Sequence, residues 1–201
     1  MGLLYLVRHG ETVMNARGIV QGGLDSPLTP QGRKQAERAA RWLARHEAAF
    51  AVAACSPQGR AQRTLDLMCA AEPVLAAARR ETLSCLREYS YGTADGTPVH
   101  DLAGDPWNPR RDFQDLGGDT VRDVADGLFC ALHDLMEQSA GSAVAVSHGT
   151  TMKLFVDATL AESGSSRRLT PQELSNGCIV VMRHDSATKT FRLVDVIARP
   201  V

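Results

Sequence analysis

The sequence predicts an α/β fold, in which helices are layered on a largely parallel sheet. Three observations predict it. Short apolar runs alternate along the chain with longer segments of helical periodicity. Several of these runs end directly at polar clusters, and helix-capping residues precede the clearest periodic segments. Strands that alternate with helices over 201 residues are typical of sheets whose strands run mostly in parallel.

The expected strands are the short apolar runs. Residues 3–7 and 143–146 are continuous enough to be buried strands, and 51–54 is a weaker candidate because alanine forms strands poorly. A short strand is expected around 82–84. Residues 177–182 and 191–196 form a late pair, separated by a polar stretch that is typical of a hairpin loop.

Two helices carry clear start signals. Thr29 is a natural N-cap with Pro30 at the first helical position, and Thr120 caps a second helix. Residues 60–71 and 149–158 are expected as further helices. The apolar stripes of the two capped helices, which should face the core, are Ala36, Ala39, Ala40 and Leu43 in one and Val121, Val124, Ala125, Leu128, Leu132 and Leu135 in the other.

Residues 92–118 differ from the rest of the chain. Glycine, proline and aspartate occur there without any period, so we expect an irregular lid or substrate-specificity segment. The length fits one domain over residues 1–201 with a well-buried core.

Composition and charge exclude several classes of protein. The chain is 44% hydrophobic and 22% charged, which is ordinary for a globular protein. Its 22 basic and 23 acidic side chains give a net charge of −1, so no global field favours nucleic acid or an anionic membrane. The five cysteines are odd in number and never form a C-x-x-C pair, and the apolar runs are too short for a secretory signal or a membrane span. We therefore expect a cytoplasmic protein without membrane or nucleic-acid partners.

Two of the expected strands deliver a histidine followed by a glycine. His9-Gly10 follows the first run and His148-Gly149 follows the run at 143–146. Ligands of parallel sheets bind beyond the carboxyl ends of the strands. Arg8 and Arg60 supply guanidinium forks at the same edge, and His148 precedes a helix N-terminus. Together these groups predict a pocket for a phosphoryl group.

His9 is the candidate nucleophile of this pocket. A neutral imidazole nitrogen can attack phosphorus and hold the group as phosphohistidine. Cationic side chains would stabilise the equatorial oxygens, a task that Mg²⁺ performs in other enzymes. The sequence has no carboxylate cluster at metal-ligand spacing, so neither a metal nor another cofactor is expected.

Glu88 is the candidate proton donor for the leaving oxygen, because it follows an expected strand and opens the irregular segment. Position alone leaves a second interpretation open, in which Glu88 merely pairs with Arg87 or another arginine. His46, His100, His133 and His184 are expected to be structural or solvated, His100 with some chance of lining the substrate mouth. Arg110 and Arg111 are candidates for contacting an acidic substrate.

At these residues the sequence resembles the histidine phosphatase superfamily, the phosphoglycerate mutase-like proteins. The resemblance extends over nearly the whole chain. Its motifs are Leu6-Val7-Arg8-His9-Gly10-Glu11-Thr12, Asn15, Gln21-Gly22, Pro27-Leu28-Thr29, Ser56-Pro57, Arg60-Ala61, Leu86-Arg87-Glu88, Gly117-Gly118-Asp119-Thr120 and Val146-Ser147-His148-Gly149.

The resemblance implies a three-layer sandwich with helices on both faces of the sheet. It also implies His9 as the phosphorylated nucleophile, Arg8, Arg60 and His148 as the phosphate pocket, and Glu88 as the proton donor. Residues expected to line the substrate pocket are Asn15, Gln21 and Gly149. Departures from the family pattern, such as Arg63 at a usual glutamine and Ala94-Asp95-Gly96 at a usual Trp-Glu-Gly, disturb any inference of the substrate.

The leading hypothesis is a metal-independent phosphatase that hydrolyses small phosphorylated metabolites. The first alternative is a phosphoglycerate mutase primed by bisphosphoglycerate, although mutases of the family usually carry a longer, Arg- and Tyr-rich insertion after the acid. The second alternative is a non-catalytic module that binds phosphorylated ligands; such a module would be expected to lack His9 or Glu88. A homodimer is possible.

Overall fold

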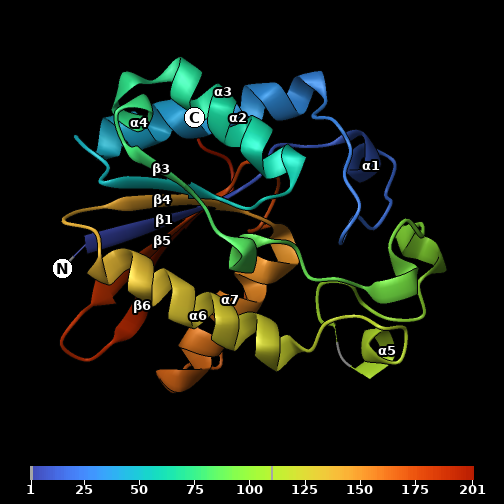
Figure 1. Ribbon diagram of the computed structural model, residues 1–201. Helices are drawn as coiled ribbons and strands as arrows, with labels where there is room; N and C mark the ends of the chain where they lie inside the picture. Colours follow the sequence, from blue (N-terminus) through green and yellow to red (C-terminus); the bar gives the residue numbers. More distant parts are fainter. Residues whose placement is uncertain (1, 110) are drawn as a thin grey trace.

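The computed structural model describes residues 2–109 and 111–201 and centres on one six-stranded sheet (Figure 1). The strand order is β3-β2-β4-β1-β5-β6. The first four strands in this order pair in parallel, β5 is antiparallel to β1, and β6 returns from β5 as a hairpin. The bounds are β1 Gly2–Arg8, β2 Val52–Cys55, β3 Arg79–Thr82, β4 Ala143–Ser147, β5 Ile179–Asp185 and β6 Thr190–Ile197.

The expected strands are confirmed at five of six places, and the prediction at 82–84 is wrong. The strand there, β3, ends at Thr82, and Ser84–Leu86 forms a 3₁₀ turn instead. β3 lies at the edge of the sheet with mostly exposed side chains, so its sequence lacks the apolar run that marks a buried strand.

Helices cover both faces of the sheet, as Figure 1 shows. Helices α2 (Pro30–His46), α3 (Gly59–Ala71) and the short α4 (Pro73–Ala76) pack on one face. Helices α6 (Val121–Glu137) and α7 (Gly149–Glu162) pack on the other. The expected α/β fold with a mostly parallel sheet between helical layers is therefore confirmed.

The strands divide their side chains between two cores. In β1, Leu4 and Leu6 join the core beneath α6 and α7, whereas Tyr5 and Val7 join the core beneath α2 and α3. Successive side chains of a strand point to opposite faces, so a run buried on both sides must be apolar throughout. This explains why the central strands are continuous apolar runs.

Both predicted helix caps are present. The Thr29 hydroxyl accepts a hydrogen bond from the Gly32 N–H at 3.0 Å, and the Thr120 hydroxyl accepts one from the Asp123 N–H at 3.0 Å. Each bond satisfies one backbone donor that the first helical turn leaves unpaired. The caps start α2 and α6 where the sequence predicts them.

The irregular segment at 92–118 packs into a third apolar cluster. It contains two 3₁₀ turns (Gly92–Ala94 and Val99–Asp101) and the short helix α5 (Arg111–Gln114). With α1 (Val13–Ala16) it lies beyond the carboxyl end of β1, on the right in Figure 1. The cluster joins Val20, Tyr89, Tyr91, Ala94, Phe113 and Leu154.

Within the described part of the chain, none of the helices combines the length and the apolar character needed to cross a membrane.

Candidate active site

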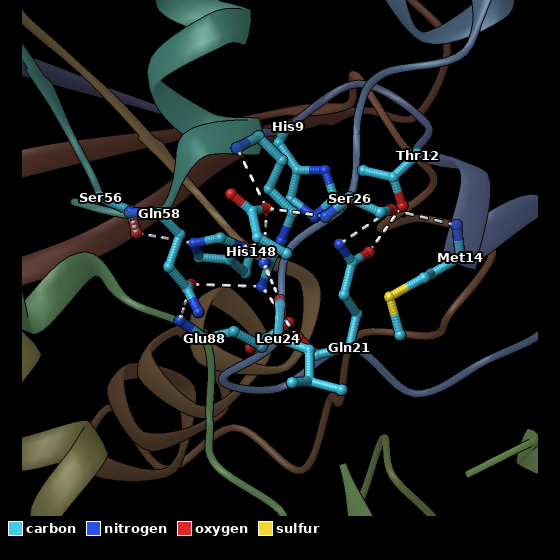
Figure 2. A network of polar contacts seen from close by, with 12 residues as sticks. His9, Thr12, Met14, Gln21, Leu24, Ser26, Ser56, Gln58, Glu88 and His148 are labelled. Carbon is cyan, nitrogen blue, oxygen red and sulfur yellow. Dashed lines mark hydrogen bonds and ion pairs between the residues drawn. The ribbon is translucent and has the colours of Figure 1, made fainter. Parts of the chain in front are cut away.

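The sheet brings the two His-Gly pairs together. Arg8 at the end of β1 is paired in parallel register with Ser147 at the end of β4, so His9 and His148 follow at the same edge. Their ring centroids are 5.0 Å apart, and the two rings lie beside each other in Figure 2. β2 ends at the neighbouring position and delivers Ser56.

A small pocket of about 90 Å³ opens at this edge. His148 lies behind it, fully buried, and does not line it. Seven of the eight expected site residues do line it, together with groups from the 92–118 segment. The wall consists of Arg8, His9, Asn15, Val20, Gln21, Gly22, Arg60, Glu88, Tyr91, Val99, Pro106, Trp107, Gly149 and Thr150.

His9 is held as a neutral imidazole with one bare nitrogen. Its Nδ1 lies 2.8 Å from the carbonyl oxygen of Gly10. A carbonyl oxygen only accepts, so Nδ1 carries the proton and Nε2 keeps its lone pair. Burial lowers the pKa of His9 well below its usual value, and the charges of Arg60 and Arg8 lower this pKa further. The nitrogen that a nucleophile needs is therefore unprotonated at neutral pH.

The backbone beside His9 is fixed by two side chains that sequence reasoning missed. Asn176 Nδ2 donates to the carbonyl oxygen of His9 at 3.1 Å and to Asn15 Oδ1 at 3.2 Å. The Gly10 N–H donates to Thr64 Oγ1 at 3.1 Å. Asn176 is far away in sequence and belongs to no motif that marks it, so only the fold reveals its contact.

Arg8 forms one wall of the pocket. Its Nη1 donates to the carbonyl oxygen of Leu174 at 2.6 Å, and its Cζ lies 5.1 Å from the centroid of the Trp107 ring. Its Nε is buried and has no hydrogen-bond partner among the described residues. Burial lowers the pKa of Arg8, while Glu88 and other groups raise it. The ordinary pKa of an arginine is so high that its guanidinium stays cationic at neutral pH.

Arg60 ties the loop at 21–25 to helix α3. Its Nη1 donates to the carbonyl oxygen of Leu24 at 2.6 Å, and its Nη2 donates to the carbonyl oxygens of Gln21 and Gly22 at 3.2 and 3.1 Å. Asp25 pairs with Nη1 at 3.2 Å. Only 2% of Arg60 is exposed, and these hydrogen-bond partners offset the free-energy cost of burying its charge.

Arg60 also sets the tautomer of His148. The Arg60 Nε–H donates to His148 Nδ1 at 3.1 Å, so the proton of this ring sits on Nε2, which donates to Ser56 Oγ at 2.8 Å. Burial and the charge of Arg60 lower the pKa of His148 well below its usual value. His148 is therefore neutral and is held rigidly on both sides.

Glu88 is bound to the start of α7. Its Oε1 accepts from the N–H groups of Tyr89 and Thr151 at 3.0 and 2.9 Å and from the Thr151 hydroxyl at 3.0 Å. The Thr150 N–H lies 3.4 Å from Oε2. Sequence reasoning expected the first N–H groups of this helix to point at phosphate; two of them instead serve Glu88.

The alternative in which Glu88 pairs with Arg87 is wrong. The Arg87 guanidinium forms a two-pronged contact with Asp119, at 2.7 and 2.8 Å, and so is turned away from the carboxylate. The side chain of Gln58, which sequence reasoning did not single out, accepts from the Glu88 N–H at 2.8 Å and from Arg60 Nη2 at 3.2 Å. In Figure 2 Gln58 lies beside Glu88, and a dashed line marks their contact.

Asn15 and Gln21 are at the mouth of the pocket. Gln21 Oε1 accepts from the Thr12 hydroxyl at 2.6 Å, and its Nε2 donates to Ser26 Oγ at 3.2 Å (Figure 2). Asn15 closes a capping box with Thr12. Both side chains are held by other residues of the protein. The Asn15 Oδ1 accepts from the Thr12 N–H and from Asn176 Nδ2, and these two contacts orient its amide.

Two aromatic residues, Tyr91 and Trp107, line the pocket: Tyr91 directly precedes the irregular segment at 92–118, and Trp107 lies within it. The Tyr91 hydroxyl lies 2.7 Å from Thr150 Oγ1 and donates to the carbonyl oxygen of Pro106 at 3.1 Å. Trp107 covers Gly149, and a Cβ at that glycine would lie 2.7 Å from the indole. The mouth is therefore partly apolar. His100 is exposed beside Asp101 and does not line the pocket; Arg110 and the side chain of Arg111 lie outside the described residues.

Comparisons with known proteins agree with this architecture. The chain is 32% identical over 182 residues to a probable phosphoglycerate mutase, GpmB, of Salmonella paratyphi A, covering 83% of this chain and 79% of that protein. A phosphoglycerate mutase structure from Bacillus anthracis superposes with a TM-score of 0.78 at 18% identity, covering 98% of this chain and 93% of that one. A mycobacterial glucosyl-3-phosphoglycerate phosphatase structure superposes with a TM-score of 0.75 at 22% identity, covering 99% and 100%. At such identities the two structures show the shared fold alone.

The family comparison covers nearly the whole chain. The model of the histidine phosphatase superfamily (branch 1) matches residues 4–196, a range that contains every residue of the pocket described above. The curated relative is more than 30% identical over more than two thirds of both chains. The chain is thus an enzyme of the histidine phosphatase superfamily, branch 1.

Proposed function

We propose that this enzyme is a metal-independent phosphatase that hydrolyses small phosphate monoesters through a phosphohistidine at His9. One observation carries the proposal: a neutral His9, whose Nε2 is bare, shares a pocket with the guanidinium of Arg8, that of Arg60 and the carboxyl of Glu88. Guanidinium groups suit the equatorial oxygens of a phosphoryl group, and the carboxyl group suits proton transfer to an ester oxygen.

The reaction has two steps. In the first, His9 Nε2 attacks phosphorus, the P–O ester bond breaks, and protonated Glu88 gives its proton to the leaving oxygen. In the second, Glu88 takes a proton from water, whose oxygen attacks phosphorus and breaks the N–P bond. Inorganic phosphate leaves and His9 returns to its neutral form. Arg8 donates to the transferred oxygens in both steps, and Arg60, whose N–H groups already have protein acceptors, stabilises them by its positive charge.

Arg8 is well suited to this task because it has a donor to offer. Its buried Nε–H has no protein partner among the described residues, and an unpaired buried donor costs about 1–3 kcal/mol. A bound phosphate oxygen would supply the missing acceptor. Binding the anion would then satisfy a group that the free enzyme leaves unpaired.

The described part of the pocket wall suits a small monoester. Arg8 and Arg60 are the only arginines or lysines among the described residues that line it. The remaining wall includes Val20, Val99 and Trp107, which suit a partly apolar leaving group.

A phosphoglycerate mutase is the second candidate, because the 32% identical relative is a probable phosphoglycerate mutase. The two activities differ in the fate of the phosphoryl group. A phosphatase releases inorganic phosphate without priming, whereas a mutase primed by bisphosphoglycerate returns the group to the sugar acid.

The test combines intermediate trapping with product analysis. The enzyme is mixed with a panel of phosphate monoesters and quenched, and the denatured protein is assayed for acid-labile phosphate. We expect a phosphoenzyme in the wild type, none in His9→Ala, and inorganic phosphate released without bisphosphoglycerate. Isomerised phosphoglycerate as the main product would establish the mutase instead. Phospho-ligand binding without turnover of any ester would establish the non-catalytic module.

We further propose that the substrates are small phosphorylated metabolites. We also propose that the enzyme acts in the cytoplasm, since all five cysteines are free thiols. A homodimer stays a prediction, for which size-exclusion chromatography with light scattering is the measurement.

A further inference from the structure

A second cluster of histidines lies at the opposite end of the sheet from the pocket. His133 and Glu137 are one turn apart on α6 and project from the same side of that helix. His184 lies on β5, paired with Gly2 at the start of β1. The pocket follows the other end of β1, on the order of 20 Å away at the rise of a strand. In Figure 1 the end of α6 and the β5–β6 turn lie on the side away from α5.

The fold buries His184, which the local sequence does not predict. It lies beyond the expected strand at 177–182, and the sequence predicts it to be structural or solvated. The structure places it within β5, 1% exposed, with Phe191 opposite it on β6 and the two ring centroids 4.8 Å apart. β5 continues through Arg183, His184 and Asp185, beyond the apolar run that predicted it.

The three side chains converge. His133 Nδ1 lies 2.8 Å from His184 Nε2, and Glu137 Oε1 lies 3.7 Å from His184 Nδ1. One ligand atom from each of the three residues lies within 4.8 Å of the others. Two ring nitrogens at 2.8 Å share a single proton, so one of them presents a lone pair to the other.

We propose that His133, Glu137 and His184 form a binding site for one divalent transition-metal ion of the zinc class. Neutral imidazole nitrogens and a carboxylate oxygen are the donors that Zn²⁺ takes, and three protein ligands with one water complete a tetrahedron. Two nitrogens bound to one Zn²⁺ are about 3.3 Å apart for Zn–N bonds of 2.0–2.1 Å. The present 2.8 Å separation therefore has to open by about half an ångström, which side-chain rotation supplies. The ring that carries the shared proton then takes its other tautomer, so that both neutral rings present a lone pair to the ion.

Access and support are both present at this site. Glu137 is exposed and His133 is half-buried, so an ion can enter from solvent. His184 is buried against Phe191 and gives one fixed ligand. A bound ion would join α6 to the β5–β6 hairpin and would stabilise the folded chain by mass action. The site is remote from His9, so the proposed phosphatase reaction does not depend on it.

The test is a titration of ZnCl₂ into the chelator-treated, tag-free full chain, followed by calorimetry and by thermal unfolding. We expect saturation at one ion per chain and a Zn²⁺-dependent rise in Tm. His133→Gln and Glu137→Gln should each weaken the binding at least tenfold, the size of effect seen when support of a metal site is removed. Both positions are at least partly exposed, so both variants should fold; His184→Gln is not needed.

Two control variants separate this site from others. His46→Gln removes an exposed histidine at the end of α2 and should leave Zn²⁺ binding unchanged. His9→Ala removes a possible ligand in the active site and should also leave it unchanged. The proposal is overturned if the wild type shows no saturable binding, if His133→Gln and Glu137→Gln bind like the wild type, or if only His9→Ala abolishes binding.

Discussion

Gly149 allows the pocket wall to close, and adding one methyl group there should damage the site. A Cβ at this position would lie 2.7 Å from Cη2 of Trp107 and 3.2 Å from Cζ of Arg8. Carbon atoms pack best at about 3.5–4.0 Å. In a Gly149→Ala variant the indole must therefore retreat by about 0.8 Å, and the guanidinium must retreat by a few tenths of an ångström.

The cost follows from which groups move. Trp107 covers the guanidinium of Arg8, and Arg8 is the group whose unpaired Nε we assign to phosphate. A misplacement of about 1 Å at a reacting centre can cost about 100-fold in rate. A smaller displacement of Arg8 should lower kcat/KM by about 10- to 100-fold, or about 1.4–2.7 kcal/mol of transition-state stabilisation. Overpacking should lower the free energy of unfolding by about 1–3 kcal/mol.

The measurement is steady-state hydrolysis of an aryl phosphate, together with inhibition by inorganic phosphate and denaturant unfolding. The matched control is Gly127→Ala on α6, where a Cβ meets nothing within 4 Å. This control should keep wild-type kinetics and gain about 0.5–1 kcal/mol of stability, because alanine favours a helix interior over glycine. Wild-type kcat/KM and phosphate inhibition in a folded Gly149→Ala enzyme would refute the role assigned to the Trp107–Arg8 contact.

Four further predictions follow from the site. His9→Ala should abolish turnover and the trapped phosphoenzyme, and residual phosphoenzyme would move the nucleophile elsewhere. Glu88→Gln should slow alkyl phosphates by about 100-fold or more and aryl phosphates much less, since only poor leaving groups need the proton; equal effects on both would show that the acid is misassigned. Because the pKa values of His9 and His148 are lowered in the folded state, the unfolded chain binds more protons, and the free energy of unfolding falls as the pH drops below about 6.5. The loss is up to about 1.4 kcal/mol per pH unit for each ring. Urea unfolding of His9→Gln should therefore show a shallower pH dependence than that of the wild type. Treatment with EDTA should leave phosphatase activity unchanged while it removes any Zn²⁺-dependent gain in Tm, and loss of activity on chelation would contradict catalysis by arginine.

Much of the fold is local and could be predicted from the sequence. The central strands are buried on both faces, so their runs are apolar throughout, and threonine caps mark the starts of α2 and α6. β3 escaped prediction at its true position because an edge strand does not need a continuous apolar run. His9 and His148 could be predicted to meet because parallel neighbours end at one edge of the sheet.

The contacts that tune the site could not be predicted in this way. The sequence indicated the residue types, but the partners of each side chain come from distant segments. Asn176 orients the backbone of His9 from 167 positions away, and Thr151 binds Glu88 from 63 positions away. Such pairings depend on how whole elements pack.

The sequence by itself determined the α/β class, the core of the sheet and the residue types that the proposed phosphoryl chemistry uses, because periodicity, capping and motif order are properties of the chain taken locally. Only the tertiary structure decided that His148 supports the pocket from behind, that Glu88 occupies the N-terminus of α7, and that His184 meets His133 across an element boundary. The physical reason is that burial, desolvation and hydrogen-bond partners are set by neighbours in space, which the order of residues along the chain does not specify.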